Sequence, residues 1–240
     1  VADVGFPRRL LHRPLELPRH AARLRGVFAE LPEEARKVVC SRAAKLGCRR
    51  VEVVERFSGR ELPQTNLVGR FQRWNAGVAR LILEAMREKF PVSDETIRGA
   101  LTEVYWPGRW EERTVGGRKV IIDCTHNPEG AVELRQNLVE RVGPPKGTLD
   151  IIVGSLGLER SHAVLAVVAP FARRIHLVRP HQLRARTFAE MRAGIPHDFS
   201  GEVIEATIED LFPGGDRMNL HPETGPVLLS GSLYLVGEVY

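Results

Sequence analysis

The sequence predicts an α/β protein whose carboxyl-terminal half is a Rossmann-like, doubly wound domain with a mostly parallel sheet. Two observations predict it: short apolar runs recur after residue 110, and segments with helical spacing separate them. That alternation is typical of a parallel sheet covered on both faces. In chain order we expect a strand at 119–124, a helix at 128–142, a strand at 149–155, a helix at 161–172, a strand at 173–179, a helix at 187–194, a strand at 226–232 and a last apolar segment at 233–239.

The amino-terminal half does not show this alternation of apolar runs and helical segments. Residues 1–19 are rich in Pro and Arg without a clear period, which indicates a connecting or peripheral segment. Alternation predicts a strand at 49–57, and the break at WPG, residues 106–108, is the best candidate for a domain boundary. We therefore expect two domains, at 1–106 and 107–240. Helical spacing predicts helices at 21–31, 32–46, 76–86 and 93–104, the last with Ser93 as its N-cap.

The composition excludes several classes of protein. With 43% hydrophobic and 27% charged residues, the chain is typical of a soluble globular protein, and no apolar run approaches the length of a membrane span. Cys40, Cys48 and Cys124 have no metal-type spacing and suit a reducing cytoplasm. The net charge of +5 is spread along the chain without a nucleic-acid motif. We therefore expect a cytoplasmic protein with no membrane and no nucleic-acid partner.

A polar cluster follows the strand at 119–124 directly. In doubly wound sheets, ligands bind beyond the carboxyl ends of the strands. Asp123 and His126 lie there, beside the backbone N–H groups of the next helix, and such a pair could hold a ribose hydroxyl or a phosphate. Asn127 and Pro128 form a good N-cap and N1 pair for that helix. The alternative is that these two only begin the helix and that His126 is an ordinary surface residue.

Four segments, in order along the chain, resemble motifs of folylpolyglutamate synthases, including the bifunctional dihydrofolate synthases, within the Mur ligase superfamily. DCTHNP at 123–128 resembles the Asp-Gly-Ala-His-Asn-Pro motif of that family, and LVGRFQRWNA at 67–76 resembles its Leu-x-Gly-x-His-Gln-x-x-Asn-Ala helix opening. WPGRWE at 106–111 resembles Trp-Pro-Gly-Arg-x-Glu. SGSLYLVGEV at 230–239 resembles the closing Gly-Ser-Leu-Tyr-Leu-Val-Gly-Glu-Val. Four matches in order are far more specific than one.

The resemblance implies a fold, an activity and partners. Residues 1–106 would be the end of a Mur ligase central ATPase domain, and 107–240 the carboxyl-terminal domain. The family uses ATP and Mg²⁺ to phosphorylate a carboxylate of folate or dihydropteroate, and the amino group of L-glutamate then attacks the acyl phosphate. We expect the substrates to be L-glutamate and either folate or dihydropteroate, and the protein to be a monomer.

The resemblance also implies roles for five residues, each with a structural alternative. Asn75 and Arg109 match positions that contact the nucleotide phosphates, although Asn75 could be a polar residue early in a helix and Arg109 a solvated loop charge. Asp123 matches a residue that holds the ribose of the nucleotide. His126 matches a catalytic-site residue near the glutamate, and Ser232 a glutamate-binding segment. From the residues alone, Ser232 is an expected N-cap.

The sequence also departs from the family pattern. Phe71 stands where the family has His, Cys124-Thr125 replaces Gly-Ala, and only Glu159 and Arg160 stand where an Asp-Lys-Asp-like segment is usual. Five arginines are expected either to form a solvated face or to attract an anionic polyglutamate tail, and three tryptophans to pack around the domain boundary. These are Arg173, Arg174, Arg179, Arg184 and Arg186, and Trp74, Trp106 and Trp110.

The phosphate-binding loop Gly-x-x-x-x-Gly-Lys-Ser/Thr does not occur in the 240 residues. The chain also begins at Val1 rather than Met, so we expect a trimmed or partial product. In the family that loop belongs to the amino-terminal ATPase domain, and we predict that this polypeptide alone has no ligase activity. The alternatives are a non-catalytic binding or regulatory protein and a Mur-type ligase for another amino acid.

Overall fold

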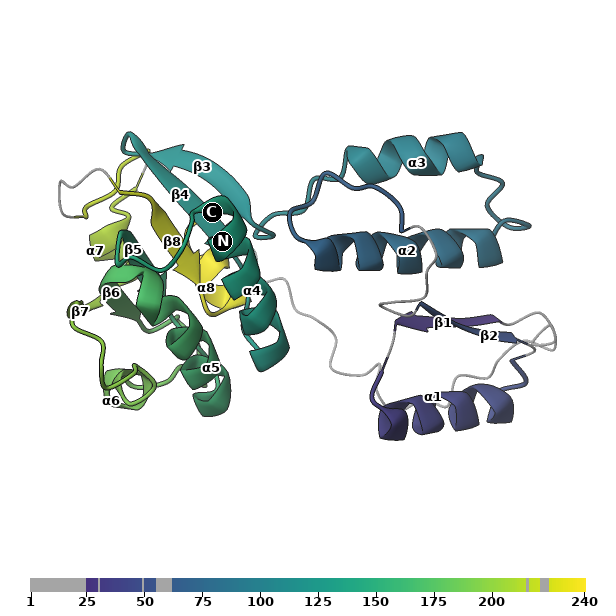
Figure 1. Ribbon diagram of the computed structural model, residues 1–240, viewed down its shortest axis with the longest axis horizontal. Coiled ribbons are helices and arrows are strands. Elements are labelled where there is room, and N and C mark those ends of the chain that lie inside the picture. The colour runs from purple at the N-terminus through teal and green to yellow at the C-terminus, as the bar shows by residue number, and fades with distance from the viewer. Residues whose placement is uncertain (1–24, 30, 49, 55–61, 215, 221–224) are drawn as a thin grey trace. The chain divides into compact units, whose positions relative to one another are not determined.

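The computed structural model of the chain describes residues 25–29, 31–48, 50–54, 62–214, 216–220 and 225–240. It contains two compact units, one drawn from Val1–Pro63 and Trp74–Ile97 and the other from Gln64–Arg73 and Arg98–Tyr240 (Figure 1). The peripheral segment predicted at 1–19 lies outside the described residues.

The first unit contains a pair of parallel strands and a helix between them in sequence. Strand β1 (Arg25–Ala29) pairs with β2 (Arg50–Val54) in the register Arg25↔Arg50 to Ala29↔Val54. The strand predicted around β2 is confirmed, whereas the helix predicted at 21–31 is wrong over its described residues. The strand β1 has only five residues, which are too few to distinguish a helical from a strand pattern. It is stabilised by pairing with β2, and this pairing leaves no signal in the local sequence. Helix α1 (Glu33–Lys45) follows Pro32 as predicted.

Helices α2 (Arg70–Ala85) and α3 (Asp94–Thr102) each contribute residues to both units. Helix α2 begins at Arg70, six residues before the predicted start at Ala76, and its first residues include Phe71 and Trp74 at helical spacing. The N-cap predicted for α3 is confirmed, since the Ser93 hydroxyl accepts a hydrogen bond of 3.1 Å from the Thr96 backbone N–H.

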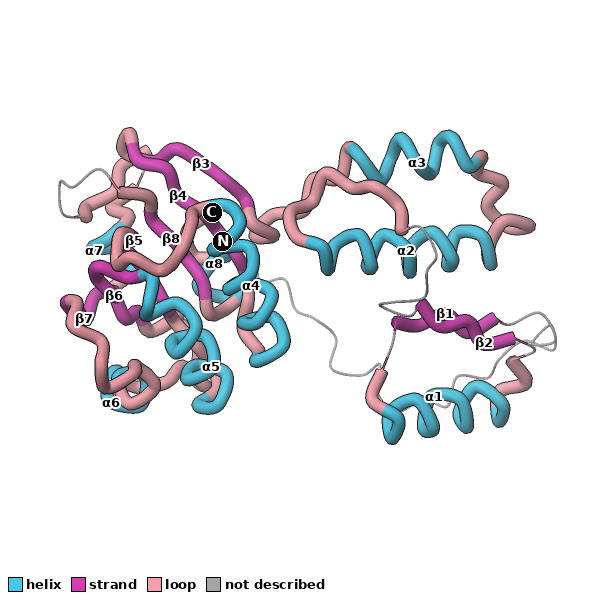
Figure 2. The backbone as a smooth tube through the Cα atoms, in the orientation of Figure 1, coloured by secondary structure: helices cyan, strands magenta, loops and turns pink. Residues whose placement is uncertain are grey.

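The second unit is built on a six-stranded sheet, and the predicted fold class is confirmed (Figures 1 and 2). The strand order is β3-β4-β8-β5-β6-β7, and every pair is parallel except β3 with β4. The strands are β3 (Glu111–Val115), β4 (Arg118–Asp123), β5 (Leu149–Val153), β6 (Ala172–Val178), β7 (Glu202–Ala206) and β8 (Val227–Ser230).

The two edge strands, β3 and β7, were not predicted from the sequence, because both are charged and lack an apolar run. Strand β3 forms a hairpin with β4 through Gly116 and Gly117, whose φ values are 56° and 76°. Two left-handed residues in a two-residue loop are the usual hairpin connection, so the Gly-Gly pair is a signal that could have revealed β3.

Helices cover both faces of the sheet. On one face lie α4 (Pro128–Arg141), α5 (Leu158–Val168) and α6 (Phe188–Arg192); on the other lie α7 (Ile208–Leu211) and α8 (Leu233–Gly237). Because side chains alternate along a strand, Ile121 packs in the first core and Ile122 in the second. The helix predicted at 161–172 begins three residues earlier, at Leu158, and also ends earlier than predicted. It ends at Val168, and a 3₁₀ turn, η2 (Ala169–Phe171), containing Pro170 leads into β6.

The position of β8 decides where a ligand could bind. Strand β8 is the last in the sequence but lies between β4 and β5. The chain leaves β4 and β5 toward helices on one face and leaves β8 toward α8 on the other. The strand order therefore reverses at the carboxyl ends of these three strands, and this is where doubly wound sheets bind ligands.

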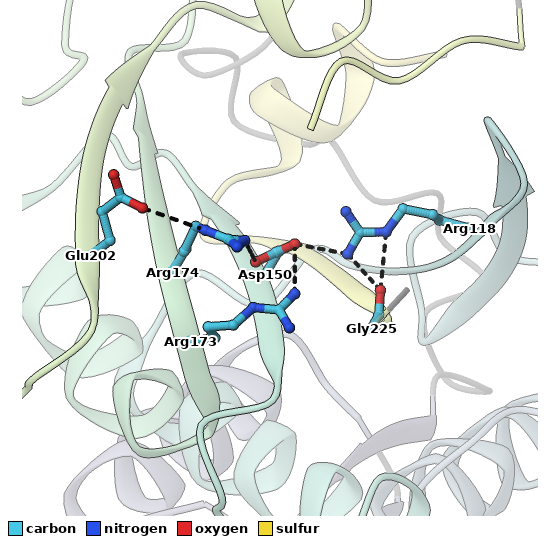
Figure 3. Close-up of polar contacts among 6 residues, drawn as sticks. All are labelled: Arg118, Asp150, Arg173, Arg174, Glu202 and Gly225. Atoms are coloured by element: carbon cyan, nitrogen blue, oxygen red, sulfur yellow. Dashed lines mark hydrogen bonds and ion pairs between the residues drawn. The ribbon is translucent and has the colours of Figure 1, made fainter. Parts of the chain in front are cut away.

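A buried ion-pair network lies near the amino ends of the strands (Figure 3). The carboxylate of Asp150 is fully buried and accepts hydrogen bonds from Arg118 (2.7 Å), Arg173 (3.2 Å) and Arg174 (3.3 Å). Nε of the same Arg174 guanidinium group pairs with Glu202 at 3.4 Å. Burial raises the pKa of Asp150, but the neighbouring guanidinium groups outweigh it and hold the pKa below the ordinary 3.8.

A β-bulge explains how two consecutive arginines reach one carboxylate. The register of β5 and β6 shifts there: Leu149 pairs with Ala172, but Asp150 pairs with Arg174. Arg173 is the extra residue, and a bulge of this kind re-aims side chains that would otherwise point to opposite faces. Two of the five arginines expected on a solvated face are therefore in an ion-pair network, Arg174 only 6% exposed.

The second unit is expected to lose stability as the pH falls from about 7 to about 5. His176 is buried in β6, and neither ring nitrogen has a hydrogen-bond partner in the part of the chain that the structure describes. Burial lowers its pKa; Asp150 and Glu202 oppose this shift, and Arg174 and Arg118 add to it.

The unfolded chain therefore binds a proton near pH 6.5 while the folded chain stays neutral, so acid favours unfolding. Urea titrations at pH 7 and pH 5 measure this loss, and the His176→Leu variant should lose less. Equal losses in the two proteins would contradict the assignment to His176.

Candidate functional site

A small pocket lies at the switch point of the sheet. Its volume is about 170 Å³, and it is formed by the loops that follow β4, β5, β6 and β8 together with the first residues of α5 and α8. A pocket of this size is smaller than the usual site for a drug-sized ligand and suits a molecule such as an amino acid. Its lining residues are His126, Ser155, Leu156, Arg160, Arg184, Gly231, Ser232, Leu233 and Tyr234.

Close backbone approach brings these loops together. Gly231 has a φ of 105°, and a Cβ atom there would lie 2.7 Å from the carbonyl oxygen of Gly154. The Gly231 N–H donates to the Thr125 carbonyl at 3.0 Å, and the Arg186 N–H donates to the Ser155 carbonyl, also at 3.0 Å. Only glycine fits at position 231, because any side chain would push the β8 loop away from the end of β5.

His126 lies at the mouth of the pocket and is exposed. Its Nδ1 lies 2.8 Å from the Cys124 carbonyl oxygen. A carbonyl can only accept, so Nδ1 carries the proton and Nε2 of the neutral ring keeps its lone pair. The next residue, Asn127, caps α4 as predicted, since its side-chain oxygen accepts from the Gly130 N–H at 2.9 Å. His126 is thus fixed by the helix start and can accept a proton through Nε2.

Ser232 lines the same pocket and is 3% exposed. Its hydroxyl oxygen accepts a hydrogen bond from the Tyr234 N–H at 3.1 Å, which confirms the predicted N-cap of α8. The hydroxyl hydrogen is not used in that bond, so Ser232 can also donate. Two of the five predicted site residues, His126 and Ser232, therefore lie in one pocket although 106 positions separate them in the sequence.

The pocket is electropositive, and its two cations were not predicted as site residues. Arg160, in the first turn of α5, and Arg184, in the loop after β6, both line it, and its described lining contains no Asp or Glu. The N-cap of α5 is Gly157, which supplies no side-chain cap. In the sequence, Arg160 stands where the family pattern is altered or lost, and Arg184 belongs to the arginines expected either on a solvated face or near an anionic polyglutamate tail. Their proximity depends on strand order, which no local pattern reports.

A tight turn holds Arg109 close to the end of β4. The Gly108 carbonyl accepts from the Cys124 N–H at 2.8 Å, and the Trp110 N–H donates to a carboxylate oxygen of Asp123 at 3.1 Å. Gly108 and Trp110 have φ values of 68° and 48°, so left-handed residues flank Arg109 on both sides. A Cβ atom at Gly108 would lie 2.3 Å from the Cys124 sulfur. Glycine is therefore required in the WPGR segment for both conformation and space.

Asp123 is 7% exposed and holds this turn. Besides the Trp110 bond, its Oδ1 accepts from the Thr125 N–H (3.0 Å) and hydroxyl (2.6 Å). Burial raises the pKa of the Asp123 carboxyl, and these hydrogen bonds together with the charge of Arg109 oppose the rise. Oδ2 accepts one described hydrogen bond and, as a carboxylate oxygen, can accept a second. The structure thus shows Asp123 as the anchor of the turn that carries Arg109.

The remaining predicted residues divide between the units. Arg109 is exposed in the second unit, with His126, Asp123 and Ser232, whereas Asn75 is exposed in the part of α2 that belongs to the first. Trp74 and Trp110 are buried, at 8% and 3% exposed, whereas Trp106 is 62% exposed. That the three tryptophans pack around the domain boundary stays a prediction.

Among the described residues, no three His, Cys, Asp or Glu side chains form a group that could hold a metal ion. None of the helices that the structure describes is long and apolar enough to cross a membrane.

A doubly wound sheet with a small polar pocket at its switch point defines a class: proteins that hold a nucleotide or another small polar molecule at the carboxyl ends of their strands. The chain is 25% identical over 182 residues to the dihydrofolate synthase/folylpolyglutamate synthase of Bacillus subtilis (strain 168). The match covers 73% of this chain and 40% of that relative. The resemblance that the four motifs predict is thereby confirmed.

Solved structures share the fold. A folylpolyglutamate synthase from Thermotoga maritima matches 89% of this chain and 52% of its own, with a TM-score of 0.61 and 24% identity. The Mycobacterium tuberculosis folylpolyglutamate synthase complexed with ADP matches 89% of this chain and 53% of its own, with a TM-score of 0.67 and 19% identity. No known family model matches the chain. The chain therefore spans about half of these two structures and less of the curated relative.

Proposed function

We propose that this chain is the carboxyl-terminal part of an ATP-dependent ligase that adds L-glutamate to folate or dihydropteroate. Residues 1–106 would be the end of its ATPase domain and 107–240 its amino-acid-binding domain. The observation that carries the proposal is the pocket of about 170 Å³ with two arginines and a histidine at the switch point. The similarity to proteins named folylpolyglutamate synthase supports the choice of substrates.

The chemistry of L-glutamate matches the pocket. Glutamate has two carboxylates, and each can take charge-assisted hydrogen bonds from a guanidinium group. Arg160 and Arg184 would supply them, with the Ser232 hydroxyl as a further donor. Glutamate also has an ammonium group, which must lose a proton before it can attack a carbonyl carbon. The free Nε2 of His126 would accept that proton at the mouth of the pocket.

The turn at 106–110 would contact the nucleotide. ATP supplies the phosphoryl group that activates the carboxylate of the folate substrate. Arg109, exposed at the end of β4, would bind its phosphates, because the guanidinium fork suits phosphate oxygens. Asp123 would hold a ribose hydroxyl through its second Oδ2 position, and Asn75 would contact phosphates from the ATPase domain. We assign none of the described residues to Mg²⁺, since none form a group of metal ligands.

Titration with L-glutamate tests the pocket. We expect Arg160→Ala and Arg184→Ala each to weaken binding about 10- to 100-fold, because each removes a charge-assisted hydrogen bond worth about 1.5–3 kcal/mol. Arg135→Ala is the matched control, since Arg135 is exposed on α4 and does not line the pocket. The titration can be followed by NMR on the 240-residue chain, where weak binding remains measurable.

Three outcomes of this titration would contradict the proposal. If Arg160→Ala and Arg184→Ala bind L-glutamate as tightly as the control Arg135→Ala, the pocket is not the glutamate site. Preference for an uncharged or basic amino acid would favour a Mur-type ligase with another substrate. Binding of no amino acid by the intact fold would favour a binding or regulatory protein.

A further inference from the structure

One carboxylate connects the turn that carries Arg109 to the end of the chain. Glu111 is the first residue of β3, and its Oε2 accepts hydrogen bonds from the Gly108 N–H, at 3.0 Å, and from the Tyr240 hydroxyl. Its Oε1 accepts from Arg113 at 2.6 Å. All three donors point at a side chain that is 13% exposed. Glu111 therefore joins the turn, the edge strand and the carboxyl-terminal residue.

Tyr240 is held by two contacts. Its hydroxyl donates to Glu111, and its ring lies 4.0 Å from the guanidinium carbon of Arg113, a cation–π distance. Burial raises the pKa of Glu111, but the hydrogen bonds from Tyr240, Gly108 and Arg113 outweigh it, and the pKa is lower than usual. Glu111 thus stays ionised at neutral pH and accepts all three bonds.

Helix α8 packs against the same turn. Val236 of α8 would lie 3.4 Å from a Cβ atom at Gly108. The helix begins at Ser232, which lines the pocket, and Tyr240 lies three residues after it ends at Gly237. One short helix therefore has its start at the proposed glutamate pocket and its end at the proposed nucleotide-binding turn.

We propose that Tyr240 and Glu111 are positioning residues that hold Arg109 in the orientation in which it binds nucleotide phosphates. The proposal rests on the proposed function of Arg109. The backbone on both sides of Arg109 is held by a carboxylate: Glu111 holds the N–H of Gly108, and Asp123 holds that of Trp110.

The conformation of the turn explains why it needs these contacts. Trp110 is a bulky residue at a φ of 48°, which is unfavourable and persists only where surrounding contacts over-determine it. Without the Glu111 bond, the hydrogen bond from the Cys124 N–H to the Gly108 carbonyl is what remains of the described hydrogen bonds to Gly108. The turn can then relax and move Arg109. The sheet stays folded, because Trp110 remains packed in its core.

The experiment is an NMR titration with Mg·ADP of a longer protein that includes the phosphate-binding loop, following the Nε–H signal of Arg109. We expect Tyr240→Phe and Glu111→Gln to weaken ADP binding about 3- to 10-fold, because the loss of one ordinary hydrogen bond changes an affinity by about this factor. Tyr240→Phe keeps the ring over Arg113 and removes only the hydroxyl. Glu112→Gln is the matched control, since Glu112 is the next carboxylate along β3 and a glutamine oxygen can still accept from the Trp110 ring N–H.

Hydrogen exchange of the Gly108 amide is the second readout. It should accelerate in Tyr240→Phe and Glu111→Gln, while the urea midpoint stays that of the wild type. Affinity and exchange both unchanged in Tyr240→Phe would overturn the inference, and a shifted urea midpoint with unchanged affinity would reduce Tyr240 to a structural role.

The two proposals fail in different ways. If Arg109→Ala weakens ADP binding but Tyr240→Phe does not, only the positioning inference fails. If the Arg109 signal of the wild type does not respond to Mg·ADP, or if Arg109→Ala binds as tightly as the wild type, the proposed nucleotide contact fails and the inference falls with it.

Discussion

Replacing Asp150 with alanine is expected to destabilise the second unit by about 3–5 kcal/mol, the usual cost of leaving buried charges without their partner. Asp150 is fully buried and is the common acceptor of Arg118, Arg173 and Arg174. These three arginines come from β4 and β6, on either side of β5 and β8. Their guanidinium groups would lose the anion that offsets their burial. The measurement is the free energy of unfolding from urea titration.

Glu202→Ala is the control for this prediction. Glu202 lies at the outer end of the same network, but its side chain is 62% exposed. Exposed ion pairs contribute about 0–1 kcal/mol, so this variant should stay close to the wild type. A loss below about 1 kcal/mol in Asp150→Ala as well would mean that water reaches the arginines, and the network would then be structurally unimportant.

Replacing Arg109 with alanine is expected to lower kcat/KM for ATP about 10²- to 10³-fold, the usual loss when one preorganised donor to a developing charge is removed. The stability should change by less than about 0.5 kcal/mol, because Arg109 is exposed. Arg109→Lys should recover only part of the activity, since an ammonium cannot reproduce the guanidinium fork. We expect the 240-residue chain alone to be inactive, so the assay requires a longer protein that includes the phosphate-binding loop.

Arg135→Ala again serves as the matched control, because it removes an exposed arginine of the same unit from α4. Wild-type kinetics in Arg109→Ala would exclude a nucleotide contact at this position. A loss of activity accompanied by an equal loss in Arg135→Ala would point to a general effect of charge, and salt dependence would then distinguish the two.

Local patterns predicted the interior of the second unit well. Strands β4, β5 and β8 each contain three consecutive apolar residues, and β6 has Ile175, Leu177 and Val178 around His176. Such short runs are visible in the sequence because both faces of these strands are buried. The helix starts at Asn127 and Ser232 were also visible, since an N-cap depends only on a side chain and the next few backbone N–H groups. Strands β1, β3 and β7 were missed, because pairing with another strand stabilises them and leaves little local signal.

The candidate site was predictable only in part. The motifs pointed to His126 and Ser232, and the structure places both in one pocket. Arg160 and Arg184 were missed because an arginine in the first turn of a helix or in a loop has the same sequence signal whether it faces solvent or a ligand. Asp123 was predicted as a ligand-binding carboxylate, and the structure shows three of its hydrogen bonds going to the protein itself.

The sequence by itself determined the α/β class, the buried strands, the polar ends of those strands and the resemblance to folylpolyglutamate synthases. The tertiary structure alone decided that β8 enters the sheet between β4 and β5, which brings four loops around one pocket. It also decided that Glu111 joins Gly108 to Tyr240, which lies 129 positions after Glu111 in the sequence. The physical reason is that burial and capping act over a few residues, whereas strand order depends on the free energy of packing the whole sheet.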